Sequence, residues 1–305
     1  MNPGPTLLES AAHTDLHPIG YTAIVKAIIS EVLASARRRL STAPFGPDTR
    51  EATLLLGHIL GWSEAQVIAR QQEALNETQT NHFELTVNRR LTGEPVAYIL
   101  GTKEFYGRPF QVDDRVLIPR PETEHLVEVV LDLPLPRWPS ILDLGTGSGC
   151  IACTLALELP ASRIVAGDLS VAALAVARSN LRLHGLTDRL QLLAGDLAKG
   201  LDLTPFDLVV SNPPYIGLEE TASISSEILD FEPDTALFAG AAGDVLHHRL
   251  FREMIRLRQA SWLVMEIGAG QQQLIENSAA DSPFRLVEVR PDYAGYPRIA
   301  VLQHG

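Results

Sequence analysis

The feature that most constrains the fold is a regular alternation of short apolar runs and segments of helical periodicity from Pro139 onward. Strands are predicted at 140–144, 163–167, 189–193, 206–211 and 261–267, with helices at 149–159, 170–184 and 269–279. Such alternation is typical of a doubly wound parallel sheet. Two further strands, 284–289 and 298–302, have no helix between them, which predicts an antiparallel C-terminal edge.

The first part of the chain has helical periodicity only. Apolar residues recur at helical spacing from Tyr21 to Leu40, a helix is expected from Asp48 to Leu60, Ser63 caps a third, and a fourth runs from near Thr78. The pattern predicts a small helical bundle over 20–93, preceded by a disordered N-terminus over 1–19. Gly93-Glu94-Pro95 ends it, and 96–101 and 104–107 are expected to be short strands. Residues 94–112 would form a hairpin linker to a catalytic domain over 113–305.

Charge and cysteine content exclude several classes of protein. The formal net charge of -12 argues against a protein that mainly neutralises nucleic-acid phosphates. The two cysteines, Cys150 and Cys153, are one helical turn apart and form neither a disulfide framework nor a metal site, so no metal is expected. Without a signal peptide pattern or a bilayer-spanning apolar run, we expect a soluble cytoplasmic protein with no membrane partner.

A polar turn follows the apolar strand 206–211. It consists of Asn212, Pro213, Pro214 and Tyr215. Two consecutive prolines cannot continue a ladder, so the chain must leave the sheet at Asn212. Open α/β sheets bind ligands outside the carboxyl ends of their strands, which makes this turn a candidate pocket floor. A plain strand-ending turn is the competing interpretation, because Asn and Pro are common turn residues.

A glycine-rich loop joins the first strand of the sheet to its helix. It comprises Gly145, Thr146, Gly147, Ser148 and Gly149. Glycines let the backbone approach a ligand closely, and the helix N-terminus beyond them offers unpaired N–H groups. The alternate spacing differs from the G-x-G-x-x-G dinucleotide fingerprint. Asp143, just before the loop, places a carboxylate beside the site, which suits a cationic ligand better than a pyrophosphate.

Carboxylates also end the next two predicted strands. Asp168 can accept from ribose hydroxyls, and Asp196 can accept from an exocyclic amine. Either could instead cap the following helix, and for Asp168 that alternative is strong. Glycine backbone, a ribose acceptor, an adenine acceptor and surplus negative charge together describe a site for S-adenosyl-L-methionine, whose sulfonium is positive.

These motifs resemble those of a known family. Asp143 to Gly149 looks like the first motif of class I S-adenosylmethionine-dependent methyltransferases, and 212–215 is similar to the motif of those that methylate planar nitrogens. The stretches 93–95, 101–105, 117–124, 232–233 and 292–295 extend the similarity to the HemK/PrmC family of peptide chain release factor glutamine methyltransferases. The resemblance covers about residue 20 to the end. It implies a Rossmann-like, mostly parallel sheet with an N-terminal helical substrate-recognition domain.

Site residues follow from the resemblance position by position. It implies cofactor contacts from Gly145 to Gly149, from Asp168, from the Asp196-Leu197 turn and from Asn212, with S-adenosyl-L-homocysteine as product. It also implies a substrate glutamine held by residues 212–215. Leu197 stands where some members carry tryptophan, and an aliphatic side chain should still cover the adenine face. Residues 241–245 depart from the family pattern and have no functional interpretation.

The implied activity is methylation of a glutamine amide nitrogen in the Gly-Gly-Gln loop of a release factor, by a monomer that contacts no nucleic acid directly. A ribosomal-protein glutamine methyltransferase and a nucleic-acid adenine methyltransferase are the enzymatic alternatives. The acidic catalytic part and the lack of an obvious basic target-recognition insertion weigh against the latter. A non-catalytic nucleotide-binding module would not need the complete Asn212 to Tyr215 motif.

Overall fold

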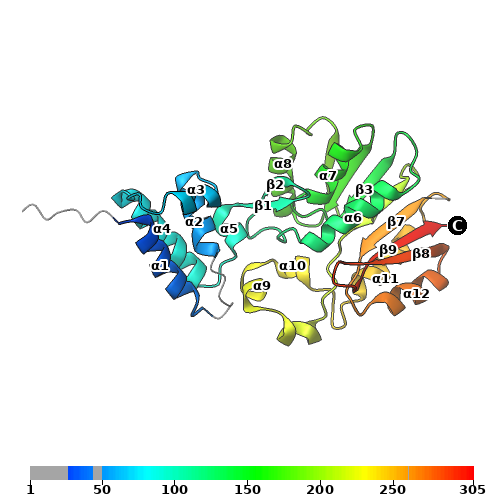
Figure 1. Cartoon of the computed structure of the whole chain (residues 1–305). Coiled ribbons are helices and arrows are strands. Elements are labelled where there is room, and N and C mark those ends of the chain that lie inside the picture. The colour runs from blue at the N-terminus through cyan, green and yellow to red at the C-terminus, as the bar shows by residue number, and fades with distance from the viewer. Residues whose placement is uncertain (1–26, 44–49, 260) are drawn as a thin grey trace, which may run out of the picture.

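The N-terminal part of the protein is a helical bundle in the computed structural model, which describes residues 27–43, 50–259 and 261–305 (Figure 1). Its helices are α1 (Ile29–Leu40), α2 (Glu51–Leu60), α3 (Glu64–Ala69), α4 (Glu77–Leu91) and α5 (Val96–Leu100). The fully buried side chains of Ile29, Leu55 and Phe83 belong to one cluster that joins α1, α2 and α4. The predicted bundle is therefore present in the described residues.

Local sequence signals fix the ends of these helices. Ser63 and Asn76 form capping boxes at the starts of α3 and α4, with side-chain oxygens that accept from the backbone N–H of Gln66 and Gln79. Gly61 ends α2 in the left-handed conformation, with φ 66°. The expectations for residues 1–19, for the part of the first helix before residue 27 and for Asp48 lie outside the described residues.

The expectation of a strand at 96–101 is wrong, because this apolar run forms α5. Pro95 precedes it with φ -56°, Gly101 ends it with φ 68°, and a short apolar run cannot be assigned to strand or helix by periodicity alone. The hairpin follows instead, with β1 (Thr102–Phe105) antiparallel to β2 (Arg108–Gln111). Tyr98 of α5 is buried beside Val112 and Val116.

The C-terminal part contains a sheet of seven strands in the order β5-β4-β3-β6-β7-β9-β8. The five strands β3 (Ser140–Leu144), β4 (Arg163–Asp168), β5 (Leu190–Ala194), β6 (Leu208–Ser211) and β7 (Trp262–Glu266) are parallel to their neighbours among these five. β9 (Pro297–His304) is antiparallel to both β7 and β8 (Phe284–Pro291). The predicted mostly parallel sheet, with its antiparallel C-terminal edge, is confirmed.

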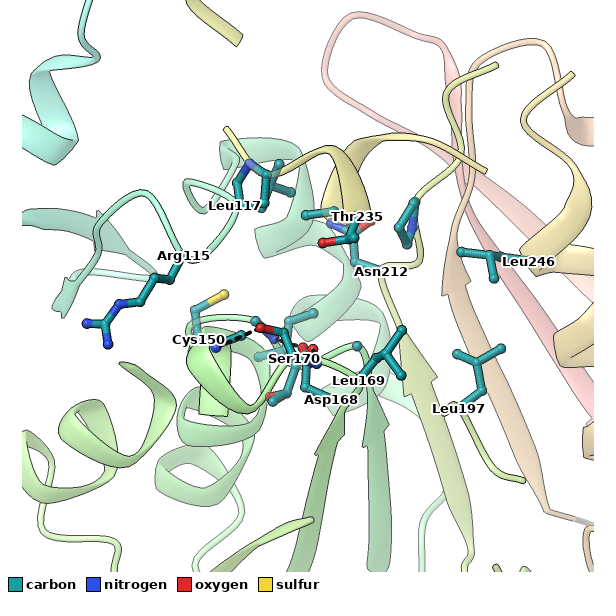
Figure 2. A pocket seen from close by; sticks show the side chains of 18 of the residues that line it. Arg115, Leu117, Cys150, Asp168, Leu169, Ser170, Leu197, Asn212, Thr235 and Leu246 are labelled. Carbon is teal, nitrogen blue, oxygen red and sulfur yellow. Dashed lines mark hydrogen bonds between the residues drawn. The ribbon is translucent and has the colours of Figure 1, made fainter. Parts of the chain in front are cut away.

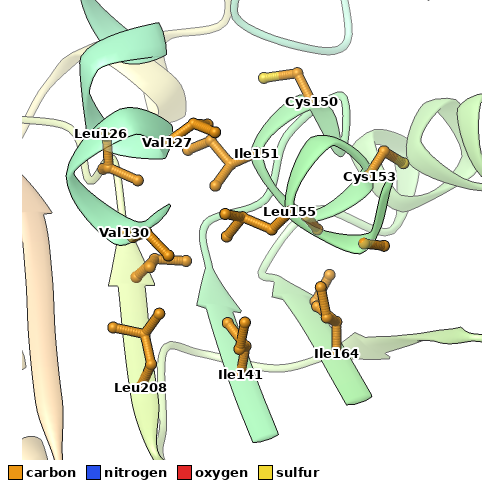
Figure 3. Packing of buried hydrophobic residues seen from close by; sticks show 14 of the residues in the cluster. Leu126, Val127, Val130, Ile141, Cys150, Ile151, Cys153, Leu155, Ile164 and Leu208 are labelled. Atoms are coloured by element: carbon orange, nitrogen blue, oxygen red, sulfur yellow. The ribbon is translucent and has the colours of Figure 1, made fainter. Parts of the chain in front are cut away.

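Helices cover both faces of this sheet, because successive strand residues point to opposite sides. Ile141, Leu208 and Val264 face α6 (Pro121–Asp132) and α7 (Cys150–Glu158), as Figure 3 shows for the first two. Their neighbours Leu142 and Val209 lie on the other face, with α11 (Val245–Met254) and α12 (Gln272–Ala280). α8 (Val171–Leu183) lies along β4 and β5. None of the helices in the described part of the chain has the length and apolar character of a membrane span.

A segment between β6 and α11 joins the two parts of the molecule. It contains a 3-10 turn (Leu218–Ser223), α9 (Ser226–Phe231) and α10 (Asp234–Leu237), drawn in yellow beside the helical bundle in Figure 1. The buried guanidinium of Arg90 in α4 donates to Glu51 and also to Glu227 of α9, at 3.2 Å. We call residues 218–240 the bridging segment. None of its helices, nor α11, was predicted.

Candidate active site

A cavity of about 330 Å³ lies at the carboxyl ends of β3, β4 and β6 (Figure 2). The chain crosses from one side of β3 to the other here, since β4 and β6 lie on opposite sides of it. This is the position where open α/β sheets bind ligands. Of the residues predicted from sequence, those that line the cavity are Gly145, Thr146, Gly147, Asp168, Asp196, Leu197, Asn212 and Pro214.

The glycine loop forms one wall of the cavity. Gly145, Gly147 and Gly149 all have positive φ, of 74°, 54° and 80°. A Cβ added at Gly147 would meet no atom within 4 Å, so the space beside its backbone is open to a ligand. At Gly149 it would lie 3.3 Å from Cβ of Ala177, so this glycine serves close packing against α8. Neither Gly149 nor the buried Ser148 lines the cavity.

Asp143 lies beneath the loop and does not line the cavity, contrary to the expected placement of its carboxylate beside the ligand. Its Oδ2 accepts a hydrogen bond of 2.6 Å from the hydroxyl of Thr146. Complete burial raises its pKa to about 7, a shift that the Thr146 hydrogen bond opposes and the charge of Asp168 increases. Asp143 therefore holds the loop from below.

Asp168 ends β4 and faces the cavity, but its side chain is not the cap of α8. Its Oδ2 accepts from the backbone N–H of Gly147 and its Oδ1 from that of Ser170, both at 2.8 Å. The helix cap itself is Ser170, whose hydroxyl oxygen accepts from Ala173 N. Asp168 thus ties the glycine loop to the start of α8 while facing the cavity, where a ligand hydroxyl can reach its remaining lone pairs.

The turn after β5 supplies the opposite wall. Leu197 lines the cavity with φ 52°, an uncommon conformation for a non-glycine residue. The carboxylate of Asp196 accepts from Arg249 of α11 at 2.6 Å, and this hydrogen bond lowers its pKa. Arg249 also donates to the carbonyl of Asp196 at 2.9 Å. α11 thereby fixes the turn, a role that the sequence analysis did not anticipate.

Asn212 stands where β6 leaves the sheet, and it and Pro214 line the cavity. Pro213 is buried, and Tyr215 lies behind the wall with its hydroxyl 3.2 Å from Oε1 of Glu266. The side-chain Nδ2 of Asn212 donates to Oγ1 of Thr123 at 3.1 Å. Thr123 in turn donates to Oε2 of Glu266 at 2.7 Å. Asn212 and Pro214 therefore form part of the cavity wall, whereas Pro213 and Tyr215 do not line the cavity.

Several residues of this site were not predicted as site residues from the sequence. They are Arg115, Leu117, Arg120 and Thr123 from the end of the loop before α6 and its first turn, Leu169 from the turn after β4, Pro233 and Thr235 from the bridging segment, and Leu246 from α11. The carboxylate of Glu232 accepts from Arg120 at 2.5 Å and from the backbone N–H of Ile118 at 3.1 Å. The family resemblance at 117–124 and 232–233 is the sequence signal for four of these residues, whereas those at 115, 169, 235 and 246 lie outside it.

The sequence matches known families along much of its length. Residues 31–101 match the family model of the PrmC N-terminal domain, and residues 123–236 match that of the methyltransferase small domain. A release factor glutamine methyltransferase from Koribacter versatilis (strain Ellin345) is 37% identical over 278 residues, which cover 90% of this chain and 97% of that protein. The chain belongs to the release factor glutamine methyltransferase family.

Longer relatives contain the same unit. A bifunctional methyltransferase from Rickettsia bellii (strain RML369-C) is 36% identical over 278 residues, with 82% of this chain and 50% of that protein covered. The chain thus spans about half the length of that bifunctional relative. Among solved structures, a methyltransferase from Pyrococcus furiosus has a TM-score of 0.51 at 15% identity, covering 72% of this chain and 97% of that one. This likeness shows the fold alone.

In this member of the release factor glutamine methyltransferase family, the two family-model matches cover different parts of the molecule. The first match holds α1 to α5, up to Gly101, and the second runs from Thr123 to Ala236. The cavity residues from Thr123 to Ala236, with the glycine loop and Asn212 among them, lie within the second match. Arg115, Leu117, Pro119 and Arg120 lie between the two matches, and Leu246 lies beyond them.

Proposed function

We propose that the protein methylates the side-chain amide nitrogen of a glutamine in a peptide chain release factor, by direct transfer from S-adenosyl-L-methionine. One observation carries the proposal: Asn212 and Pro214 line the same cavity as the glycine loop and Asp168. A site for a planar amide and a site for the methyl donor are thereby adjacent. The glutamine of a Gly-Gly-Gln loop is the proposed target.

The cavity suits S-adenosyl-L-methionine. Open space beside Gly147 leaves room for a ligand against the loop backbone, and Asp168 and Leu197 face the cavity from neighbouring strand ends. We assign Asp168 to the ribose hydroxyls and Leu197, with the Asp196 turn, to the adenine. When bound, this compound supplies an electrophilic methyl group on a positively charged sulfur.

The chain's own contribution is to orient the amide. A glutamine amide nitrogen is a poor nucleophile, because its lone pair is delocalised into the carbonyl. Oδ1 of Asn212 and the backbone carbonyl of Pro213 each accept one N–H of the amide in our proposal, which aims the nitrogen at the methyl group. Pro213 has a fixed φ and no competing N–H. Holding both reactants in line can supply roughly 7–11 kcal/mol of the barrier.

The same two acceptors select glutamine over glutamate. A carboxylate would face Asn212 Oδ1 and the Pro213 carbonyl without a hydrogen to offer either of them. Each buried polar group left unpaired costs about 1–3 kcal/mol. A release factor whose target glutamine is replaced by glutamate is therefore expected to bind far more weakly than the natural factor.

We further propose that the helical bundle over 20–93 recognises the protein substrate and that one chain suffices for catalysis. A glutamine side chain is common to most proteins, so the cavity alone cannot choose one target. Contacts remote from the reacting amide must add selectivity. For an enzyme with a release factor as substrate, we also propose a cytoplasmic location and no direct contact with nucleic acid or membrane.

Incubation with labelled S-adenosyl-L-methionine and a purified release factor tests the proposal. We expect label on a single glutamine of the factor, located by peptide mass spectrometry, and none on a factor with that glutamine changed to glutamate. Label on a ribosomal protein in a cell extract, without label on the factor, would contradict the assigned substrate. Label on nucleic acid would contradict the assigned reaction.

A further inference from the structure

A chain of three side chains runs from the cavity into the protein interior. Asn212 of the turn after β6 and Thr123 at the start of α6 both line the cavity, and Glu266 ends β7. Thr123 and Glu266 are 2% and 1% exposed, so no bulk water competes for their hydrogen bonds. The nitrogen–oxygen contact is 3.1 Å and the oxygen–oxygen contact is 2.7 Å, both ordinary hydrogen-bond lengths.

The chemistry of the middle group fixes the direction of both bonds. A threonine hydroxyl has one hydrogen to donate and two lone pairs to accept with. An ionised carboxylate only accepts, so Thr123 must give its hydrogen to Glu266 and keep lone pairs for Asn212. The Asn212 amide can then satisfy Thr123 only through Nδ2, which turns Oδ1 away from Thr123. With Glu266 ionised, donor and acceptor counting gives this direction, and both hydrogen bonds of the structure have it.

We propose that Thr123 and Glu266 are positioning residues which fix the side-chain amide of Asn212 with its oxygen toward the substrate. The inference rests on the proposed function, because it assigns these residues to the orientation of the glutamine amide. Neither residue need touch the substrate glutamine to do so. With the Asn212 amide reversed, an N–H would meet the N–H of the substrate, and the orienting hydrogen bond would be lost.

Groups around Glu266 support its acceptor role. The hydroxyl of Tyr215 donates to Oε1, so both carboxylate oxygens accept from the wall of the site. The guanidinium of Arg298, held by Asp292, adds a nearby positive charge that favours the ionised form, whereas Glu122 opposes it. Burial raises the pKa of Glu266, and the bonds from Thr123 and Tyr215 counteract that shift.

The decisive variant is Thr123→Val, which keeps the shape of threonine and removes the hydroxyl. Thr123→Ser keeps the hydroxyl and removes the methyl. Thr154→Val is the matched control, because Thr154 is fully buried in α7, lies outside the cavity and has no hydrogen-bond partner for its hydroxyl among the described residues. All are compared in full-length protein for kcat, KM for the release factor, and Kd for S-adenosyl-L-methionine by calorimetry.

We expect Thr123→Val to lower kcat by about tenfold to a hundredfold, the range for one lost orienting hydrogen bond of about 1–3 kcal/mol. Thr123→Ser should restore most of the rate, Thr154→Val should match wild type, and the Kd should stay within about threefold throughout. A factor carrying glutamate at the target position should inhibit Thr123→Val more strongly than wild type, because a reversed amide offers its N–H to a carboxylate. A merely structural role of Thr123 would not strengthen that inhibition.

The possible outcomes separate this inference from the proposed function. Wild-type protein inactive on any release factor would overturn the proposed function itself. Active wild type with equally active Thr123→Val, or with Thr123→Ser as impaired as the valine variant, would overturn the positioning role alone. A Thr123→Val protein that loses affinity for S-adenosyl-L-methionine as much as it loses kcat would also overturn the positioning role. If Thr123→Val does not fold, Thr123→Ala with the same measurements takes its place.

Discussion

At the scale of single residues, two glycines of the glycine loop are needed for different reasons. Gly149 is required by the neighbouring helix, whereas Gly147 borders open space and has φ 54°. A side chain at 147 would therefore project into the ligand space and strain the backbone as well. The two positions should respond differently to the same substitution.

We expect Gly147→Val to weaken S-adenosyl-L-methionine binding at least a hundredfold while the protein stays folded. Titration calorimetry measures the affinity, and thermal unfolding reports the fold. Gly149→Val is the comparison: it should lower the midpoint of unfolding more than Gly147→Val does, because it collides with Ala177. An unchanged affinity in a folded Gly147→Val protein would remove the loop from the site.

Asp143 gives a prediction on pH. Its pKa is raised from 3.8 to about 7 by burial, so the folded protein holds a proton that the unfolded chain releases. Its stabilising contribution is complete below pH 3.8 and is lost as the pH rises toward 7. Asp143→Asn keeps an acceptor for Thr146 without the charge, so its stability relative to wild type should increase between pH 4 and 8. The gain should reach a few kcal/mol, at about 1.4 kcal/mol per pKa unit.

Urea unfolding at several pH values measures this difference. Asp202→Asn is the control, since Asp202 is an exposed carboxylate whose pKa is lowered by backbone and side-chain bonds from Thr204. The stability of Asp202→Asn relative to wild type should not increase between pH 4 and 8. A constant difference between Asp143→Asn and wild type across the range would mean that Asp143 is ionised in the folded protein.

At the scale of elements, the sequence predicted the sheet well because each of the five parallel strands is a short, mostly apolar run. Gly147, Asp168 and Asn212 lie together at the cavity because the carboxyl ends of parallel strands share one edge of the sheet. Five apolar residues, 96–100, are too few to separate strand from helix, so α5 was mistaken.

Other parts of the site depend on how elements pack and could not be predicted. The Thr123–Glu266 hydrogen bond joins residues 143 positions apart, and it exists because the start of α6 lies over the end of β7. Arg249 reaches the Asp196 turn from α11, a helix that the sequence analysis did not identify. Polar residues of this kind have no local pattern, because their partners come from distant elements.

The contact between α4 and the bridging segment yields a prediction at this scale. Arg90 is 2% exposed and donates to Glu51 through two nitrogens and to Glu227 through one of them. Removing one partner of a buried ion pair costs about 3–5 kcal/mol, so Arg90→Met should destabilise the protein by an amount of that order. Arg89→Met, at an exposed pair with Glu94, should cost about 0–1 kcal/mol.

Chemical denaturation of the two variants gives the comparison. Arg90→Lys should not restore stability, because an ammonium cannot reproduce the two-nitrogen contact with Glu51. Equal losses for Arg89→Met and Arg90→Met would show that the interior position of Arg90 carries no extra stability.

At the scale of the whole molecule, the helical bundle and the methyltransferase sheet have separate cores. Tyr98 of α5 packs with Val112 and Val116 on the sheet side, whereas Ile99 packs with the bundle. A shortened protein starting near Gly93 should therefore keep the sheet and the cavity. It would lose the proposed surface for the release factor.

We expect the shortened protein to bind S-adenosyl-L-methionine with nearly unchanged affinity but to lose most of its activity on an intact release factor. On a short peptide containing Gly-Gly-Gln, too small to reach the bundle, both forms should be similarly slow. Steady-state assays with both substrates measure this. Equal activity of the two forms on the intact factor would leave the bundle without a role in substrate recognition.

The position of β9 also determines the order in which the molecule can be completed during synthesis. β9 is synthesised after β8 yet lies between β7 and β8, so residues 297–304 must pair with both of these strands. Until they leave the ribosome, the edge of β7, with Leu263, Val264 and Met265, has no neighbour on that side. An open apolar edge is a template for association with other chains. A nascent chain stalled before residue 297 would thus expose the unpaired edge of β7. Chaperones that cover unpaired strand edges should bind this chain in preference to the finished protein.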